Sequence, residues 1–227
     1  MNMEPDLQIS VNGLPQDLAL NVGNTIAAII KALKNADENL DFRHMRHIVV
    51  TTDFAGELAE LSSQTASGNK ITYTNEDYAV AVAKVMIIPD GDKFEIRPIL
   101  SAQYVAALVP EGSVGYDAEK FYYTLHLLHH ELCHVHDDNK KIDAFHELML
   151  NHHYKGKDMF IRPLSEICWS EYIANFLSYK SATDTNINHI VTSLEDAIRR
   201  TKSDIDNEIL LLPQNSVGFD HLLGAFG

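Results

Sequence analysis

The segment His130-Glu131-Leu132-Cys133-His134 has the pattern His-Glu-x-x-His. Four residues of an α-helix advance about 6 Å and rotate about 400°, so the two histidines lie on one face, one turn apart. Two imidazoles in this arrangement can share one Zn²⁺ ion at about 2.0–2.1 Å each. Glu131 is rotated about 100° from His130, which places its carboxylate beside the ion as a base for an activated water. The pattern therefore predicts a metal centre with a general base.

The pattern is specific for this composition. The chain has 12 histidines, and about 0.04 accidental matches are expected in a sequence of this kind. The segment from Asp117 to Asp137 is also amphipathic at helical spacing, as the mechanism requires. Its apolar residues are Phe121, Leu125, Leu128, Leu132 and Val135. We interpret the other histidines of this helix as surface residues or as supports of the ligands; they are His126, His129 and His136.

A catalytic zinc normally has three protein ligands and one open position. The metzincin extension is excluded, because Asp137 and Lys140 stand where its glycine and histidine would be. A glutamate on a following helix is the other common third ligand, and we predict Glu171. Ala174 is small enough to let two helices approach, and Asn175 lies on the same face as Glu171. We expect Asn175 to accept the free ring N–H of a ligand histidine.

Other residues stay open as weaker candidates for the third ligand. Glu166 lies on the same predicted helix, but about 140° away from the face of Glu171. A glutamate in the first turn is explained by the helix dipole alone. The remaining candidates are Asp143, His146 and Glu147. Four residues could stabilise an oxyanion, none of them with a motif: Tyr154, Tyr172, His146 and His221.

These residues together resemble the gluzincin class of zinc metallopeptidases. Locally they are most similar to ImmA/IrrE-type peptidases, which have the HExxH motif and then a helix with a glutamate, an alanine and an asparagine at the spacing of Glu171, Ala174 and Asn175. The resemblance covers residues 121–178, about a quarter of the chain. It implies peptide hydrolysis and a zincin-like fold, in which a sheet with an edge strand lies over the helix that carries the zinc ligands.

Two functions follow from this site. The first is a zinc-dependent metallopeptidase, a hydrolase with one Zn²⁺ per chain and a protein or peptide substrate. The alternative is a non-enzymatic regulatory or binding protein with a structural zinc on the same residues. Closed structural sites prefer four ligands, often cysteines, whereas Cys133 points elsewhere on the helix. Glu131 has no purpose in a structural site, so we expect the enzyme; zinc hydrolysis of a substrate other than a peptide is a third, weaker reading.

Composition limits the class of protein. The 227 residues are 45% hydrophobic and 22% charged, as in ordinary globular proteins, with a net charge of −14. The acidic balance argues against binding to nucleic acid, and the longest apolar runs are too short for a membrane span. The first ten residues lack the features of a signal peptide. Two cysteines are too few for a disulfide framework, so we expect a cytoplasmic protein.

Hydrophobic patterning predicts strands first and helices later, which is typical of an α+β fold. We expect a strand at 47–52, a helix capped by Asp53, and three extended pieces between 78 and 109, the last at 104–109. Pro98 favours an edge strand, and the pieces at 94–109 could pair with an extended substrate. Further helices are expected at 25–34 with Asn24 as N-cap, at 117–137, at 165–180 with Ser165 as N-cap, and at 191–200.

We expect a single domain over residues 1–227, with a mainly strand-containing part at 1–112 and a helical part at 113–227 that carries the zinc site. The expected fold is zincin-like, a small mixed or antiparallel sheet packed on the active-site helix and followed by further helices. The residues expected to pack the helix at 165–180 against the core are Ile167, Trp169, Ile173, Phe176 and Leu177.

Overall fold

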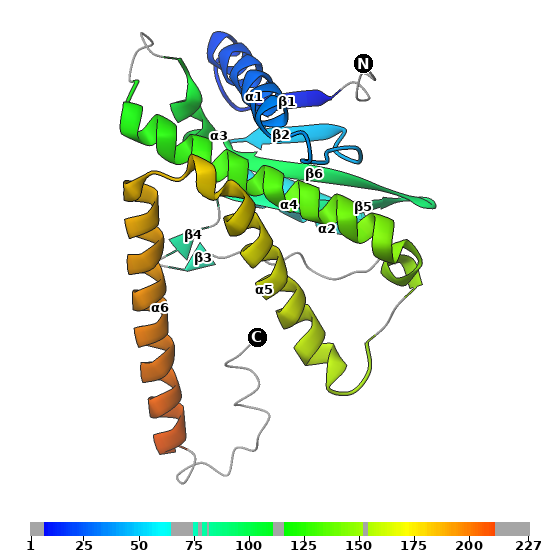
Figure 1. The fold of residues 1–227 in the computed structure, drawn as a ribbon, viewed down its shortest axis with the longest axis vertical. Helices are drawn as coiled ribbons and strands as arrows, with labels where there is room; N and C mark the ends of the chain where they lie inside the picture. Colours follow the sequence, from blue (N-terminus) through cyan, green and yellow to red (C-terminus); the bar gives the residue numbers. More distant parts are fainter. Residues whose placement is uncertain are drawn as a thin grey trace. The chain divides into compact units, whose positions relative to one another are not determined.

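The computed structural model describes residues 7–64, 75–76, 79–80, 82–110, 116–151 and 154–211. The chain divides into two compact units, residues 1–182 and residues 183–227 (Figure 1). The first unit contains the sheet and most of the helices. The described part of the second unit is one helix, α6 (Asp184–Leu211). The expectation of a single domain stays a prediction.

A four-stranded mixed sheet lies in the first unit, with strand order β1-β2-β6-β5. β1 (Gln8–Asn12) pairs in parallel with β2 (His47–Thr51), which pairs in parallel with β6 (Lys93–Ser101). β5 (Ala83–Asp90) is an antiparallel edge strand beside β6. The predicted α+β class with a small mixed sheet is confirmed.

Two short strands form a separate antiparallel pair. They are β3 (Asn75–Glu76) and β4 (Ala79–Val80).

The hairpin between β5 and β6 turns at Gly91, whose φ of 65° is in the left-handed region that glycine adopts without steric cost. The sequence Pro89-Asp90-Gly91-Asp92 consists of residue types that favour turns.

Helices cover both faces of the four-stranded sheet. α1 (Gln16–Ala36) and α4 (Ala118–Asn151) pack on one face, and α2 (Phe54–Gln64) packs on the other. Figure 1 shows α4 running across the sheet. Successive residues of a strand point to opposite faces, so Leu100 of β6 faces α4 whereas Ile99 faces α2. Buried residues of the main core include Ile26 of α1, Ile48 of β2, Ile96 of β6, and Leu132 and Val135 of α4.

Two expectations about the strands are wrong. Pro98 lies in β6, a central strand, rather than at an edge. The backbone N–H of Ile96 points toward β2 and bonds to the carbonyl of His44, so the nitrogen of Pro98 faces the same side. The ladder with β2 starts only at Ile99, and the missing N–H of Pro98 therefore falls in a gap of the pairing.

The second error concerns the extended piece expected at 104–109, because residues 102–108 form two short helices. They are α3 (Ala102–Val105) and η1 (Ala106–Leu108). Ala102, Val105 and Leu108 recur every third residue, and all three are buried. This spacing matches helical turns, and only Val105 and Val109 in the segment are β-branched.

Two of the predicted helix starts, at Asp53 and Asp117, are correct. Asp53 caps α2, accepting the N–H of Gly56 at 2.9 Å, and Asp117 caps α4, accepting the N–H of Glu119 at 3.0 Å. Asn24 and Ser165 are wrong as N-caps, because both lie inside longer helices, α1 and α5 (Asp158–Ser178). The hydroxyl of Ser165 donates to the carbonyl of Ile161, one turn earlier, at 2.8 Å.

A buried asparagine ties α4 to the loop between α1 and β2. Asn139 is fully buried, and its amide donates to the carbonyl oxygens of Asp41 at 3.0 Å and Val135 at 2.8 Å. Its side-chain oxygen accepts the backbone N–H of His44 at 3.0 Å. Every polar atom of this side chain thus has a partner, and the loop is held against the middle of α4.

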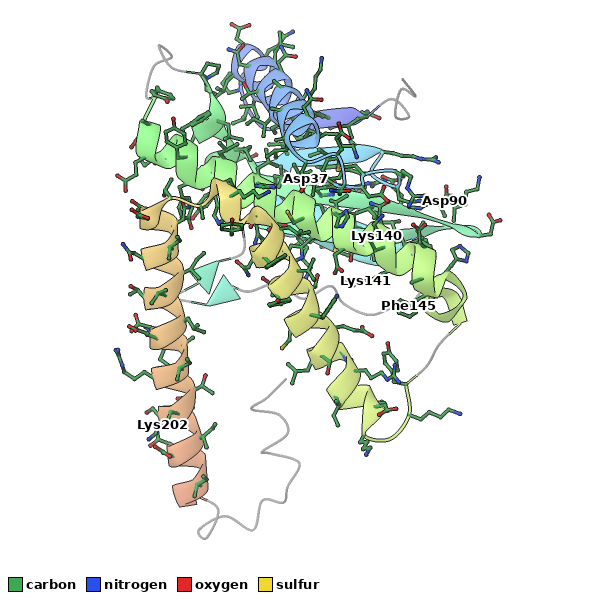
Figure 2. The ribbon with its side chains drawn as sticks, viewed as in Figure 1. Asp37, Asp90, Lys140, Lys141, Phe145 and Lys202 are labelled. Carbon is green, nitrogen blue, oxygen red and sulfur yellow. The ribbon has the colours of Figure 1, made fainter. Side chains whose placement is uncertain are left out.

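Charged and polar side chains extend this connection toward the surface. The ring of His136 accepts the backbone N–H of Asp41 at 3.0 Å, and Lys140 donates to the Asp41 carboxylate at 3.0 Å. Figure 2 labels Lys140 on α4. Burial raises the pKa of Asp41, but hydrogen bonds from Arg43 and Lys140 outweigh burial and hold that pKa below its usual range. Asp41 is therefore a carboxylate at neutral pH.

The second unit is described only through α6. Its residues Ile187, Val191, Leu194 and Ile198 are spaced by three or four and form an apolar stripe. Thr183 and Asn186 cap its first turn, the Asn186 side-chain oxygen accepting the N–H of Thr183 at 3.0 Å. The predicted helix at 191–200 lies inside α6. In the described residues, no helix has a stretch long and apolar enough to cross a bilayer.

We predict that Asn139→Ala lowers the free energy of unfolding by about 2–4 kcal/mol, measured by urea denaturation. The substitution leaves the buried carbonyl of Asp41 and the half-buried N–H of His44 without this partner, which costs about 1–3 kcal/mol for a buried group and less for a half-buried one. Asn35→Ala, at an exposed position of α1, is the control, and a surface change of this kind stays within about 0.5 kcal/mol. Equal stability of the two variants would contradict the role of Asn139.

Candidate metal centre

The site lies where α5 meets α4 in the first unit. α4 turns one side to the sheet, where Leu128, Leu132 and Val135 are buried. His130 and His134 lie on another side, facing α5, and Glu171 reaches them from there. The structure therefore brings together the three residues predicted as metal ligands.

The separations of the ligand atoms suit a small tetrahedral ion. The Nε2 atoms of His130 and His134 are 3.1 Å apart. The two carboxylate oxygens of Glu171 lie 3.5 Å from these nitrogens, one on each. Ligands at about 2.1 Å from a tetrahedral Zn²⁺ are separated by about 3.4 Å. The three side chains could thus hold a metal ion with little rearrangement.

The site is closed by protein on one side and open on the other. The side chains of His130 and His134 are each 13% exposed, whereas that of Glu171 is 55% exposed. A water or a substrate group can therefore approach from the side of Glu171. The hydrogen bond with His130 lowers the pKa of Glu171, against the opposing effect of burial, so this residue is a carboxylate at neutral pH.

Glu131 is buried beside the ligands rather than among them. Burial raises the pKa of its carboxyl to about 7, and the negative charge of Glu171 adds to this effect while His130 opposes it. The residue is 8% exposed. Its place, one residue and about 100° from His130, is the one predicted for a base.

His134 has a partner on α5 as well as a place in the ligand group. Its Nδ1 atom lies 2.9 Å from the hydroxyl of Ser170. Burial and the neighbouring His130 lower the pKa of His134 to about 4, so the ring is neutral at pH 7. In the tautomer that carries the proton on Nδ1, Ser170 accepts that proton and the lone pair of Nε2 faces the metal position.

Ser170 thus has the role at His134 that was expected of Asn175. Asn175 is exposed and donates its amide to the carbonyl of Glu171, four residues earlier in its own helix, at 2.8 Å. The expectation failed because Asn175 lies just beyond the face that meets α4. The sequence could have indicated Ser170, because this small polar residue precedes Glu171 and lies four residues before Ala174, on the same face of the helix.

Small side chains form the seam between α4 and α5. Ser170, Ala174 and Ser178 follow each other at intervals of four, and Ala174 and Ser178 are fully buried. The expectation that Ala174 lets the helices approach is supported by this burial. The predicted packing role of Ile167, Trp169 and Phe176 is wrong, because each is more than half exposed. Tyr172 stacks on Phe176 along that outer face.

The weaker candidates for the third ligand are engaged elsewhere. Glu166 accepts the hydroxyl of Tyr154 at 2.5 Å, and Asp143 pairs with Arg43. His146 bonds to the backbone carbonyl of Asp92 in the β5–β6 turn at 2.9 Å. The Glu147 side chain and the whole of His221 lie outside the described residues. Glu171 is therefore the candidate that the structure joins to the two histidines.

The other histidines of α4 are structural rather than solvated. His126 and His129 are each 7% exposed, and both ring Nδ1 atoms contact the hydroxyl of Ser181. His136 bonds to the backbone of Asp41, as described above. The prediction allowed a place at the surface or a role in support of the ligands; the surface alternative is wrong for His126 and His129, whose polar partner comes from a distant part of the sequence.

Lys84 on β5 is a residue near the site that sequence reasoning missed. Its positive charge acts on Glu131 and on Glu171, after the larger effects of burial and of the histidines on the pKa of each. An isolated lysine in a strand carries no signal of this role. Strand pairing and the packing of α4 on the sheet bring it close to both carboxylates.

We predict that Ala174→Leu removes the metal centre while the sheet remains folded. The larger side chain has no space at the seam and must separate the two helices or distort them, at a cost of about 1–3 kcal/mol. Zinc retained after dialysis, measured by elemental analysis, should fall well below the wild-type level, and circular dichroism should report a folded chain. Ile167→Leu at an exposed position of the same helix is the control. Wild-type zinc content in Ala174→Leu would show that the close approach is unnecessary.

No protein-family model matches this sequence, and comparisons with curated proteins and with solved structures found no match to the chain. The resemblance to gluzincins and to ImmA/IrrE-type peptidases therefore remains a prediction that rests on the residues of the site.

Proposed function

We propose that this chain is a zinc-dependent metallopeptidase of zincin-like fold. His130, His134 and Glu171 hold the metal, and Glu131 is the general base. The observation that carries the proposal is the convergence of three side chains from two helices: the two imidazole Nε2 atoms lie 3.1 Å apart, and each lies 3.5 Å from one carboxylate oxygen of Glu171. A buried carboxylate lies directly beside them.

Zinc supplies Lewis-acid chemistry when bound: it lowers the pKa of a water toward about 7 and polarises a carbonyl group. The chain supplies the rest. Glu131 takes the proton of the attacking water and passes it to the departing amine. Burial of this carboxylate keeps competing solvent away and holds it in one place. The half-exposed side of Glu171 leaves room for the substrate.

The donor set favours zinc but does not require it. Two imidazoles and a carboxylate also form the facial triad of non-haem iron enzymes. Glu131 distinguishes the two, because a base beside the metal serves hydrolysis of an activated water and has no role in holding iron. The neutral ring of His134, fixed by Ser170, suits either ion.

The edge strand supports a peptide as the substrate. β5 lies at the edge of the four-stranded sheet, on the side where α4 packs. An extended peptide can add to such an edge through main-chain hydrogen bonds. The expectation placed this edge at residues 94–109, but β6 occupies the centre of the sheet. β5 takes its place in the proposal.

The alternative is a regulatory or binding protein with a structural zinc on the same three residues. Glu131 separates the two functions. A structural ion has no need of a buried carboxylate next to its ligands, and burying one costs free energy. We therefore place the alternative second.

We predict that Glu131→Gln abolishes peptide hydrolysis while zinc stays bound. Glutamine keeps the shape of the side chain but cannot accept the proton, and loss of a general base costs about 10²–10⁴-fold in rate. Cleavage of a peptide library by the zinc-loaded protein, read by mass spectrometry, measures activity, and elemental analysis measures zinc.

Glu166→Gln is the matched control, since that carboxylate bonds to Tyr154 and lies outside the ligand group. It should keep wild-type activity. Activity that survives in Glu131→Gln would overturn the assignment of the base. A zinc-loaded wild type that cleaves no peptide would favour the structural alternative.

A further inference from the structure

We propose that Ser181 is a positioning residue for the metal centre: by bridging His126 and His129, it fixes the end of α5 on α4 and so sets the place of Glu171. The inference rests on the proposed metal centre. It assigns a role to two buried histidines that the proposed reaction does not use.

The contacts of Ser181 form a hydrogen-bonded node. Its hydroxyl lies 3.0 Å from Nδ1 of His126 and 2.8 Å from Nδ1 of His129. The same hydroxyl donates to the carbonyl of Ser178 at 2.9 Å. Both histidines belong to α4, and Ser181 ends η2 (Tyr179–Ser181), which continues directly from α5.

The node uses the full capacity of the serine hydroxyl. A hydroxyl has one proton and two lone pairs. Since the proton goes to Ser178, the two lone pairs are available for the Nδ1 protons of His126 and His129. A neutral imidazole with its proton on Nδ1 donates one hydrogen bond from that atom, and both Nδ1 atoms lie within hydrogen-bond distance of the Ser181 oxygen. Alanine in place of Ser181 would leave both rings without this acceptor.

The node can act on the metal centre because α5 is held to α4 along one narrow seam. Ala174 and Ser178 are buried between the helices, and Ser170 contacts His134. The N-terminal half of α5 extends away from this seam, with Ile161, Leu164 and Ile167 exposed. Two bonds from one hydroxyl to two points on α4 fix the end of α5 against both rotation and sliding. Glu171 lies on the same helix, so fixing the end of α5 also fixes the position of the Glu171 carboxylate.

The test compares metal binding by Ser181→Ala, Ser181→Thr and Ser178→Ala in the full chain. Affinity for Zn²⁺ is measured by competition with a chelator, and the coordination geometry is read from the absorption spectrum of bound Co²⁺. Thermal unfolding of the metal-free proteins is recorded in parallel. Ser178→Ala is the matched control, because the buried Ser178 hydroxyl has no hydrogen-bond partner in the described part of the chain.

Ser181→Ala should bind Zn²⁺ about 10–100-fold more weakly, the range found when groups that orient metal ligands are removed. Its Co²⁺ spectrum should shift toward that of Glu171→Ala. Threonine keeps the hydroxyl, so Ser181→Thr should restore both properties, and Ser178→Ala should match the wild type.

Unchanged zinc affinity and an unchanged Co²⁺ spectrum in Ser181→Ala would overturn the inference, even if the unfolding temperature falls, because the node would then serve stability alone. The same holds if Ser178→Ala weakens binding as much as Ser181→Ala does. A wild type that binds neither ion would instead refute the metal centre itself, which distinguishes failure of the proposed function from failure of this inference.

Discussion

The distance between α4 and α5 is the constraint on which the candidate site depends. Two of the ligands are one turn apart on α4, and the local geometry of a helix already brings them together. The third must come from a second helix, and it arrives only because the facing residues of α5 are small. Ser170, Ala174 and Ser178 let the backbones approach, and the carboxylate of Glu171 then reaches both imidazoles at 3.5 Å.

α4 carries different sets of contacts around its circumference. Its sheet-facing side packs through Leu132 and Val135, and Asn139, on the same side, fastens it to the loop before β2. Another side holds the ligand histidines, and Glu131 lies between the two sides. The helix is therefore fixed by groups that take no part in metal binding, which lets the ligand histidines be rigid before any ion is present. Such preorganisation is what a catalytic site requires.

The sequence predicted the parts of the site that depend on local spacing. His130, Glu131 and His134 follow from one helical turn, and Glu171 follows from the need for a third ligand near a small residue. The class α+β and the hairpin at Gly91 were also predictable from patterning and turn residues. Ser170, Lys84 and the partners of His126 were not, because they depend on how α4, α5 and β5 are placed in space. The predictions for Pro98 and for residues 104–109 were wrong because a gap in strand pairing and a short helix leave weak signals in a sequence.

The most direct test of the account is the metal content of the purified chain, measured by elemental analysis after expression with added zinc. The wild type should carry close to one zinc per chain, and both His134→Ala and Glu171→Ala should lose it or bind it far more weakly. A wild type without zinc would contradict the central claim. Full zinc occupancy in Glu171→Ala would contradict the three-ligand site and direct the search to another third ligand.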